Sequence, residues 1–274
     1  MKKYLYERGS TLIVVLILLV LISVIGLYAM RHSILNLKLA TNAQVQTMLM
    51  QTTDVALDHL EKHFNDNEQV GFSTTPIGQV LLDGNQGKEL QFCFKPTEID
   101  SDDELTDSVF FSLRDFRIIT RKAKDDIEAA TSVESGSYDA TCDPTTMFSI
   151  SRKALVTQVA VVNPDDPTVE LGRFALTTKK TDLKDVNIET KRVRVTVTSL
   201  APALAPSVDI DDMQDCLQQR MMDEKTLKNM EITTEGQVKV QTVHECLNNL
   251  GVPVNTQVSE YIVNLAETRS PVAE

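Results

Sequence analysis

The feature that most constrains this chain is an uncharged stretch of 22 residues, Gly9–Met30. As an α-helix, with a rise of about 1.5 Å per residue, it would be roughly 33 Å long, enough to cross the apolar core of a bilayer. The eight residues before it carry three basic side chains and one acidic one. Because basic flanks stay in the cytoplasm, we expect everything after Met30 to face outward.

Three kinds of segment fit this pattern. A cleaved secretory signal has a shorter apolar core and a small-residue exit, and Leu27-Tyr28-Ala29 is a poor exit. An uncleaved signal anchor is the second possibility. The third is a type IV prepilin leader, which needs a short basic leader, a Gly directly before the cut and an apolar helix that survives processing. Gly9 and the residues around it supply all three, and glycine leaves room for a protease to approach the backbone.

The residues after the apolar stretch continue the same helical pattern. No Pro occurs before Pro76, and Gly26 is the only Gly between Gly9 and Gly71. We therefore expect one helix from Ser10 to about Asn65, roughly 80 Å long. Its first half is apolar all round, and its second half has one apolar stripe, as packing against a globular head requires. The stripe contains Val45, Met48, Leu49, Thr52, Val55, Ala56, Leu60 and Phe64.

At these residues the chain resembles the minor type IV pilins of the PilX group. The resemblance covers about the first 60 residues. It rests on Arg8-Gly9, on Leu12, Ile13, Val14, Val15 and Leu16, on Ala29-Met30-Arg31, on Ala40-Thr41-Asn42 and on 51–57; a weaker likeness lies at 147–152. It implies insertion in the inner membrane with the head in the periplasm, cleavage after Gly9, methylation of Ser10 and a role in starting or capping pilus assembly. The implied partners are a prepilin peptidase, other minor and major pilins, the inner-membrane assembly platform and the membrane.

One position departs from the pattern of major pilins. Those subunits carry a glutamate five residues after the cut, where this chain has Val14. A carboxylate inside an apolar filament needs a charged partner, so its absence relaxes that need. Val14 thus favours the end of a filament over its repeating shaft, although a lipid-facing residue there would look the same.

The residues after Asn65 predict an antiparallel sheet with one wet face, covered on the other by the long helix, hence an α+β, pilin-like fold. In Arg192–Thr198, the valines at 193, 195 and 197 face one side, while Arg192, Arg194 and Thr196 face water. The other expected strands are Leu90–Phe94, Phe116–Thr120, Phe148–Val162 and Val169–Thr177, with a loop over Asp125–Thr141.

We expect a small α/β unit at the C-terminal side, after an Ala-Pro linker at 201–206. It contains a helix near Asp212–Met222, strands near Val238–Val243 and Val258–Leu265, and a loose tail from Thr268. The predicted organisation is a leader at 1–9, a transmembrane helix at 10–30, its amphipathic continuation at 31–66, a β-rich head at 67–200, the linker, and a subdomain with tail at 207–274.

Four cysteines, Cys93, Cys142, Cys216 and Cys246, lie in the part expected outside the cytoplasm. An even number there indicates disulfides, and four cysteines allow three pairings. Closeness in sequence favours Cys93–Cys142 and Cys216–Cys246. Free buried thiols remain an alternative, whereas the absence of C-x-x-C from the sequence disfavours a zinc ribbon or a redox motif.

Signals for catalysis or ligand binding are weak. His59 and His63 share a helical face, but the acid that a zinc protease motif needs is missing at positions 60 and 62. Acidic clusters lie at 100–104, 165–166 and 209–215, and the two longer ones do not match a calcium loop, so we expect no metal and no cofactor, with calcium at Asp209–Asp215 as the alternative. The net charge of −12 argues against a nucleic-acid partner.

The sequence therefore favours a structural minor pilin that acts by packing helices, without enzymatic activity. It would support twitching, adhesion or DNA uptake. A minor tip pseudopilin of a type II secretion system shares every N-terminal feature and is the first alternative. A signal-anchored periplasmic enzyme or binding module is the second, and it predicts no cleavage at Gly9.

Overall fold

The computed structural model describes residues 10–65, 72–95, 111, 113, 115–121, 131–137, 140–149, 154–165, 186–230 and 241–268. The chain divides into two compact units, Met1–Thr47 and Met48–Glu274. The helices are α1 (Ser10–Asn65), α2 (Pro76–Val80), α3 (Ile210–Gln219), α4 (Glu224–Met230) and α5 (Val243–Leu250), with 3₁₀ turns η1 (Phe72–Thr74) and η3 (Pro202–Leu204). The strands are β1 (Glu89–Cys93), β2 (Phe116–Arg121), β3 (Thr131–Gly136), β4 (Val156–Val162), β5 (Val186–Leu200) and β6 (Val254–Thr268).

The long helix predicted from Ser10 to about Asn65 is confirmed as α1, with those bounds. It belongs to both units, because the division at residue 47 falls within it. The sequence allows this length because Gly26 is its only glycine and it holds no proline. In the second unit, Leu49, Ala56 and Leu60 are buried, and so are the hydroxyl-bearing Thr52 and Thr53.

The six strands form one antiparallel sheet in the order β3-β2-β1-β4-β5-β6. Strands β5 and β6 are the longest pair, joined from Val186↔Thr268 to Leu200↔Val254. The predicted α+β class is confirmed. Of the expected strands, β1 and β2 lie close to their predicted bounds, β4 begins only at Val156, and 169–177 is outside the described residues.

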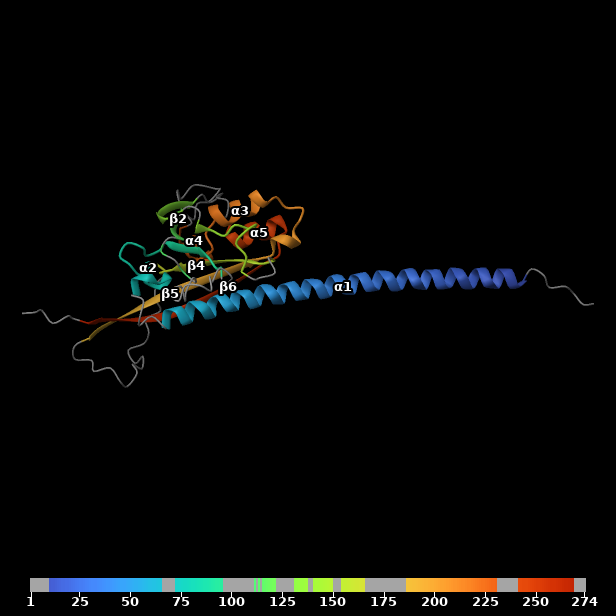
Figure 1. Ribbon diagram of the computed structural model, residues 1–274, viewed down its shortest axis with the longest axis horizontal. Coiled ribbons are helices and arrows are strands. Elements are labelled where there is room, and N and C mark those ends of the chain that lie inside the picture. The colour runs from blue at the N-terminus through green and yellow to red at the C-terminus, as the bar shows by residue number, and fades with distance from the viewer. Residues whose placement is uncertain are drawn as a thin grey trace, which may run out of the picture. The chain divides into compact units, whose positions relative to one another are not determined.

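The inner faces of α1 and the sheet make one core within the second unit. Ala56 and Leu60 of α1 pack against sheet residues that alternate along the strands, as the valine periodicity predicted. These partners include Phe92, Val159, Val161, Val193, Val195 and Val197. Figure 1 shows the last turns of α1 beside β6, and the amide of Asn255 donates a hydrogen bond to Thr53 Oγ1 at 3.3 Å.

The opposite face of the sheet is largely covered, contrary to our prediction, and it stays exposed at Val258 and Ile262 of β6. Arg194 and Thr196, expected in water, are exposed by 0% and 1%. Helices α3 and α5 cover this face, with Leu217 and Leu247 packed against Ala160. The alternating pattern of β5 is the same whether water or a second helical layer covers its polar side, so it could not distinguish the two.

The C-terminal region joins the main sheet. The strand expected near Val258–Leu265 is β6, which pairs with β5 inside the compact unit that also holds the head. Residues 201–206 contain η3, and Ala201 and Ala205 are buried, so this stretch is packed. Val243, expected at the end of a strand, begins α5 instead, and 131–136 of the expected loop is β3. The tail from residue 269 on lies outside the described residues.

Candidate functional site

The described part of the first unit, residues 10–47, is a helix whose large apolar side chains are exposed. Every large apolar residue from Leu12 to Ile25 is more than half exposed, from 71% for Leu12 to 52% for Leu18. Leu37 and Leu39 are exposed as well. By length and composition, α1 has a stretch able to cross a membrane. An apolar surface of this size marks a site that lipid or protein covers.

The few polar groups of this stretch are already satisfied or lie at its end. The hydroxyl of Ser23 donates to the carbonyl oxygen of Leu19 at 2.8 Å, one helical turn back. Tyr28 and His32 meet edge to face, with ring centroids 4.6 Å apart, beside Arg31. Aromatic and basic side chains at the end of an apolar helix are typical of a membrane–water boundary. Between Leu12 and Leu27, therefore, no polar side chain lacks a hydrogen-bond partner, and this part of the helix can be buried away from water.

The predicted processing residues are only partly within the described residues. Gly9 lies outside them, and Ser10 begins α1 but its side chain is not described. Leu12, Ile13, Val14, Val15 and Leu16 all lie on α1 and are exposed. Cleavage after Gly9 and methylation of Ser10 stay predictions.

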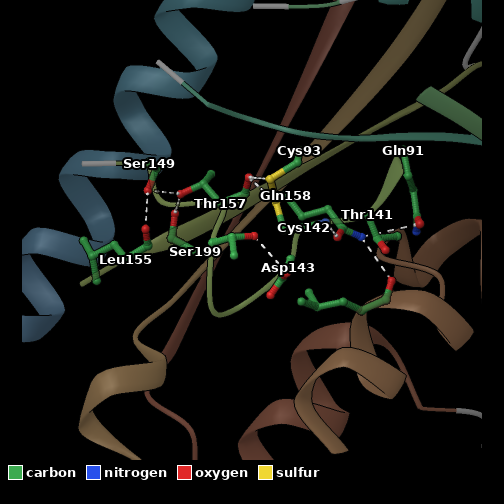
Figure 2. Close-up of a disulfide and its surroundings, with 12 residues drawn as sticks. Gln91, Cys93, Thr141, Cys142, Asp143, Ser149, Leu155, Thr157, Gln158 and Ser199 are labelled. Carbon is green, nitrogen blue, oxygen red and sulfur yellow. Dashed lines mark hydrogen bonds between the residues drawn. A yellow bond between two sulfur atoms is a disulfide. The ribbon is translucent and has the colours of Figure 1, made fainter. Parts of the chain in front are cut away.

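Both predicted disulfides form. Cys93 at the end of β1 is bonded to Cys142, and Cys216 of α3 is bonded to Cys246 of α5. The first lies in a buried polar cluster (Figure 2), where the backbone N–H of Cys142 donates to Gln158 Oε1 at 3.2 Å. The Thr157 hydroxyl joins those of Ser149 and Ser199, at 3.1 and 2.7 Å. The disulfide and these hydroxyls hold the loop around Cys142 against β4.

A buried layer of polar side chains joins the sheet to the C-terminal helices. Arg117 of β2 is fully buried and donates from Nη2 to the carbonyl oxygens of Leu217 and Gln218, at 3.1 and 2.8 Å. These carbonyls belong to the last turn of α3, where helix carbonyls have no partner within the helix. Gln91 of β1 accepts from Arg117 Nε at 3.0 Å. A cation at a helix C-terminus also matches the helix dipole, so Arg117 fixes the end of α3 on the sheet.

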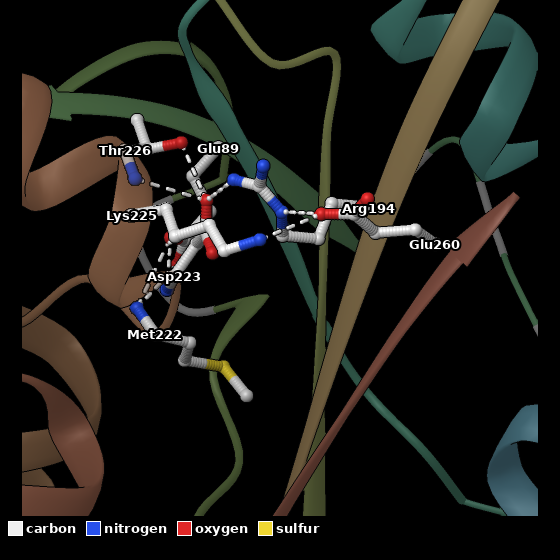
Figure 3. Close-up of polar contacts among 7 residues, drawn as sticks. All are labelled: Glu89, Arg194, Met222, Asp223, Lys225, Thr226 and Glu260. Atoms are coloured by element: carbon white, nitrogen blue, oxygen red, sulfur yellow. Dashed lines mark hydrogen bonds and ion pairs between the residues drawn. The ribbon is translucent and has the colours of Figure 1, made fainter. Parts of the chain in front are cut away.

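Glu89 of β1 fixes the turn between α3 and α4 on the sheet. Its carboxylate accepts from the backbone N–H groups of Met222, at 2.8 Å, and Asp223, at 2.9 Å (Figure 3). Burial raises the pKa of the Glu89 carboxyl to about 7, against the opposing effect of these hydrogen bonds and of the Gln91 amide.

Arg194 of β5 forms the third link. Its Nη1 lies 2.8 Å from Asp223 Oδ2, and its Nε lies 2.8 Å from Glu260 Oε1 on β6. Lys225 of α4 reaches the same Glu260 oxygen at 3.0 Å, as Figure 3 shows. Hydrogen bonds from Arg194 and Lys225 lower the pKa of Glu260 below its usual value. Asp223 also accepts from the N–H of Thr226 at 3.1 Å, which caps the start of α4.

Sequence reasoning missed this layer and the helix α5 beside it. Two signals could have found them. Glu89, Arg117 and Arg194 each stand beside apolar residues within a strand, and a charge that is buried there needs a partner. Thr242 and Glu245 also have the spacing of a capping box, which the structure forms at the start of α5.

The residues considered for metal binding make contacts of other kinds. His59 lies against Phe94, with ring centroids 5.5 Å apart, and the side chain of His63 is not described. Asp209 is the N-cap of α3 and accepts from the N–H of Asp211 at 3.2 Å. The acidic cluster at 100–104 lies outside the described residues. Among the described residues, no group of three His, Cys, Asp or Glu is placed to hold a metal ion.

A long apolar helix followed by an antiparallel sheet is the layout of a type IV pilin-like protein. Residues 8–58 match the PilX N-terminal family, which is consistent with a PilX-type minor pilin and confirms the resemblance inferred from the same segment. The match suggests a structural, non-enzymatic protein with other pilins as partners. A search of curated proteins and a search of solved structures each found no match.

Proposed function

We propose that this protein is a minor pilin that inserts in the inner membrane and joins a type IV pilus. In this proposal a prepilin peptidase cuts after Gly9, Ser10 is methylated, and the subunit starts or caps assembly. The observation that carries it is that one helix, α1, is exposed and apolar in the first unit and becomes part of the core of the second. A helix of this kind can pass from lipid to a protein filament without exposing its apolar surface to water.

Two further observations support the proposal. Val14 places no carboxylate in the apolar segment, so apart from the amine of Ser10 the mature chain would add no charge in need of a partner inside a filament. The head holds two disulfides, and disulfides persist in oxidising compartments such as the periplasm. The head would thus lie in the periplasm before assembly and at the cell surface afterwards, with the assembly platform and neighbouring pilins as partners.

The mass of the intact chain, isolated from cells that contain a prepilin peptidase, tests the proposal. We expect a chain that begins at methylated Ser10. Replacing the glycine, Gly9→Leu, should leave the precursor uncut. Gly26→Leu is the matched control, because a Cβ at Gly26 would meet no atom within 4 Å, so that variant should be processed normally. A wild-type chain that still begins at Met1 would contradict the proposal and favour a signal anchor.

The place of the subunit in the filament needs a separate measurement. An antibody against the head, applied to sheared pili, should label one end of each filament. Labelling along the shaft would contradict a starting or capping role. If deleting the protein stopped the secretion of other proteins, and the cells made no pili, the type II secretion alternative would be favoured.

A further inference from the structure

Strand β6 is the last strand of the sheet and its outer edge is long and regular. It pairs with β5 along its full length, Val254 to Thr268, without a bulge. No other strand among the described residues pairs with its outer edge. An unpaired edge presents a row of backbone N–H and C=O groups, which is a template for another strand.

This edge lacks lysine, proline, a bulge and a very short strand, which are among the features by which proteins block strand addition, and its charged residues are Glu260 and Glu267. Residues 254–268 contain no lysine, arginine or proline. Two large apolar residues, Val258 and Ile262, instead project from one face of β6 and are 55% and 60% exposed. Glu260 lies between them on that face, opposite Arg194.

A cleft of about 580 Å³ lies beside these residues, on the same face of the sheet. Its walls include Met222, Lys225, His244, Thr256, Val258 and Glu260. A strand added to β6 would place every second side chain above this cleft, because side chains alternate between the two faces of a sheet. Backbone pairing then provides affinity and the cleft provides selectivity, as in other complexes formed by strand addition.

The charges of the cleft indicate what kind of side chain would enter it. Its lining holds four carboxylates, on Asp223, Glu224, Glu245 and Glu260, against the two cations of Arg194 and Lys225, and Lys228 beside the lining pairs with Glu224 at 2.6 Å, which leaves one net negative charge. A basic side chain would therefore be attracted. A second copy of this chain is a poor occupant, since each copy carries a net charge of −12 and β6 has no basic residue to offer.

We propose that the outer edge of β6 binds an extended segment of a partner protein, with a lysine or arginine opposite Glu260 and apolar residues two positions to either side. The apolar residues would cover Val258 and Ile262, and the basic side chain would lie over the cleft. This proposal concerns the head and does not depend on processing at Gly9.

The test uses the full chain in detergent micelles and a labelled synthetic peptide of alternating threonine and valine, with arginine in place of the central valine. We expect it to bind and to slow amide exchange in β6. Exchanging its arginine for glutamate, or methylating its backbone nitrogens, should weaken binding at least tenfold. Absence of binding at millimolar peptide, or equal binding of the methylated peptide, would overturn the proposal.

Variants of the protein locate the binding. Ile262→Lys places a guarding cation on the edge and should also weaken peptide binding at least tenfold. Leu204→Lys is the matched control, because Leu204 is exposed to a similar degree, 49%, but lies in η3. Equal loss in both variants would contradict the assignment to β6. Slow exchange of the outer β6 amides in the protein alone, or a dimer broken by Ile262→Lys, would show that the chain itself or a second copy covers the edge.

Discussion

Asp223 binds Glu89 through its backbone and Arg194 through its side chain. Its N–H donates to Glu89 Oε2 at 2.9 Å, and its Oδ2 lies 2.8 Å from Arg194 Nη1. One residue at the start of α4 is thereby joined to β1 and to β5, two strands that both pair with β4. The C-terminal helices are fixed to the sheet by directed hydrogen bonds as well as by apolar packing. Directed bonds define one position of the helices on the sheet.

The raised pKa of Glu89 predicts how stability depends on pH. The carboxyl has a pKa of about 7 when folded, against an ordinary value of 4.5. Between these values the folded protein binds more protons than the unfolded chain, so the free energy of unfolding should fall as pH rises from about 4.5 to about 7. The change from this one group is on the order of 3 kcal/mol.

Glu89→Gln isolates this contribution, because glutamine does not titrate. Urea unfolding of both proteins in detergent, at pH 5 and pH 8, should show a smaller difference in the variant. Glu61→Gln, on the exposed side of α1, should keep the wild-type difference. An unchanged difference in the Glu89 variant would mean that this carboxylate is charged throughout the range.

Arg117→Ala should be among the most destabilising substitutions in the head. It removes a fully buried cation that donates to Gln91 and to the carbonyls of Leu217 and Gln218. Loss of one partner from a buried charged network costs about 3–5 kcal/mol. Lys62→Ala, which breaks an exposed ion pair with Asp58, should cost less than about 1 kcal/mol. Equal midpoints for the two variants in urea unfolding would contradict the role given to Arg117.

Removal of either disulfide should lower the free energy of unfolding of the head. The two disulfides close loops with sequence separations of 49 and 30 residues, for which chain entropy gives roughly 3–4 kcal/mol each. Replacing both Cys216 and Cys246 by alanine should lower the free energy of unfolding by this amount and loosen α3 against α5. Limited proteolysis should then cut near these helices first. The Cys93 and Cys142 double variant serves as the comparison, with first cuts expected near residue 142.

The packing of α1 in the second unit can be tested by adding volume. Ala56 is fully buried against the sheet, whereas its neighbour Val55 is 45% exposed. Ala56→Leu should destabilise the head by about 1–3 kcal/mol, because overpacking forces side chains and backbone to shift. Val55→Leu adds one methylene on the exposed side and should leave thermal unfolding nearly unchanged. Equal effects would mean that α1 does not pack through this face.

The sequence predicted the elements whose signals are periodic and uninterrupted. The bounds of α1 followed from its unbroken apolar pattern, and β5 from the alternation of Val193, Val195 and Val197. It could not tell that Arg194 is buried, because its partners are 29 and 66 residues away in sequence, in Asp223 and Glu260. The prediction that Arg194 faces water was therefore wrong, although the strand that contains it was predicted correctly.

The C-terminal region was predicted less well for a related reason. The β-branched run before Val243 favoured a strand, whereas the capping pair Thr242 and Glu245 begins a helix that is stabilised by packing against α3 and by a disulfide. Local propensity is weak where distant contacts decide. The apolar stretch of α1 was predictable because a helix that is covered by lipid or by apolar protein must meet one simple demand, which is the absence of charge.

A charge in the apolar segment should block assembly without affecting the head. Ile17 is 53% exposed in the first unit, far in sequence from the core of the second. Ile17→Lys would place an ammonium group in lipid, at a cost of about 2.5–3.5 kcal/mol for membrane insertion, and again in a filament core. We expect less protein in the membrane fraction and none in sheared pili. Gln44→Lys, also exposed on α1 but outside the uncharged stretch, should reach both fractions normally. Both heads should unfold at the wild-type temperature. If Ile17→Lys entered pili at the wild-type level, this part of α1 would not be buried in the filament.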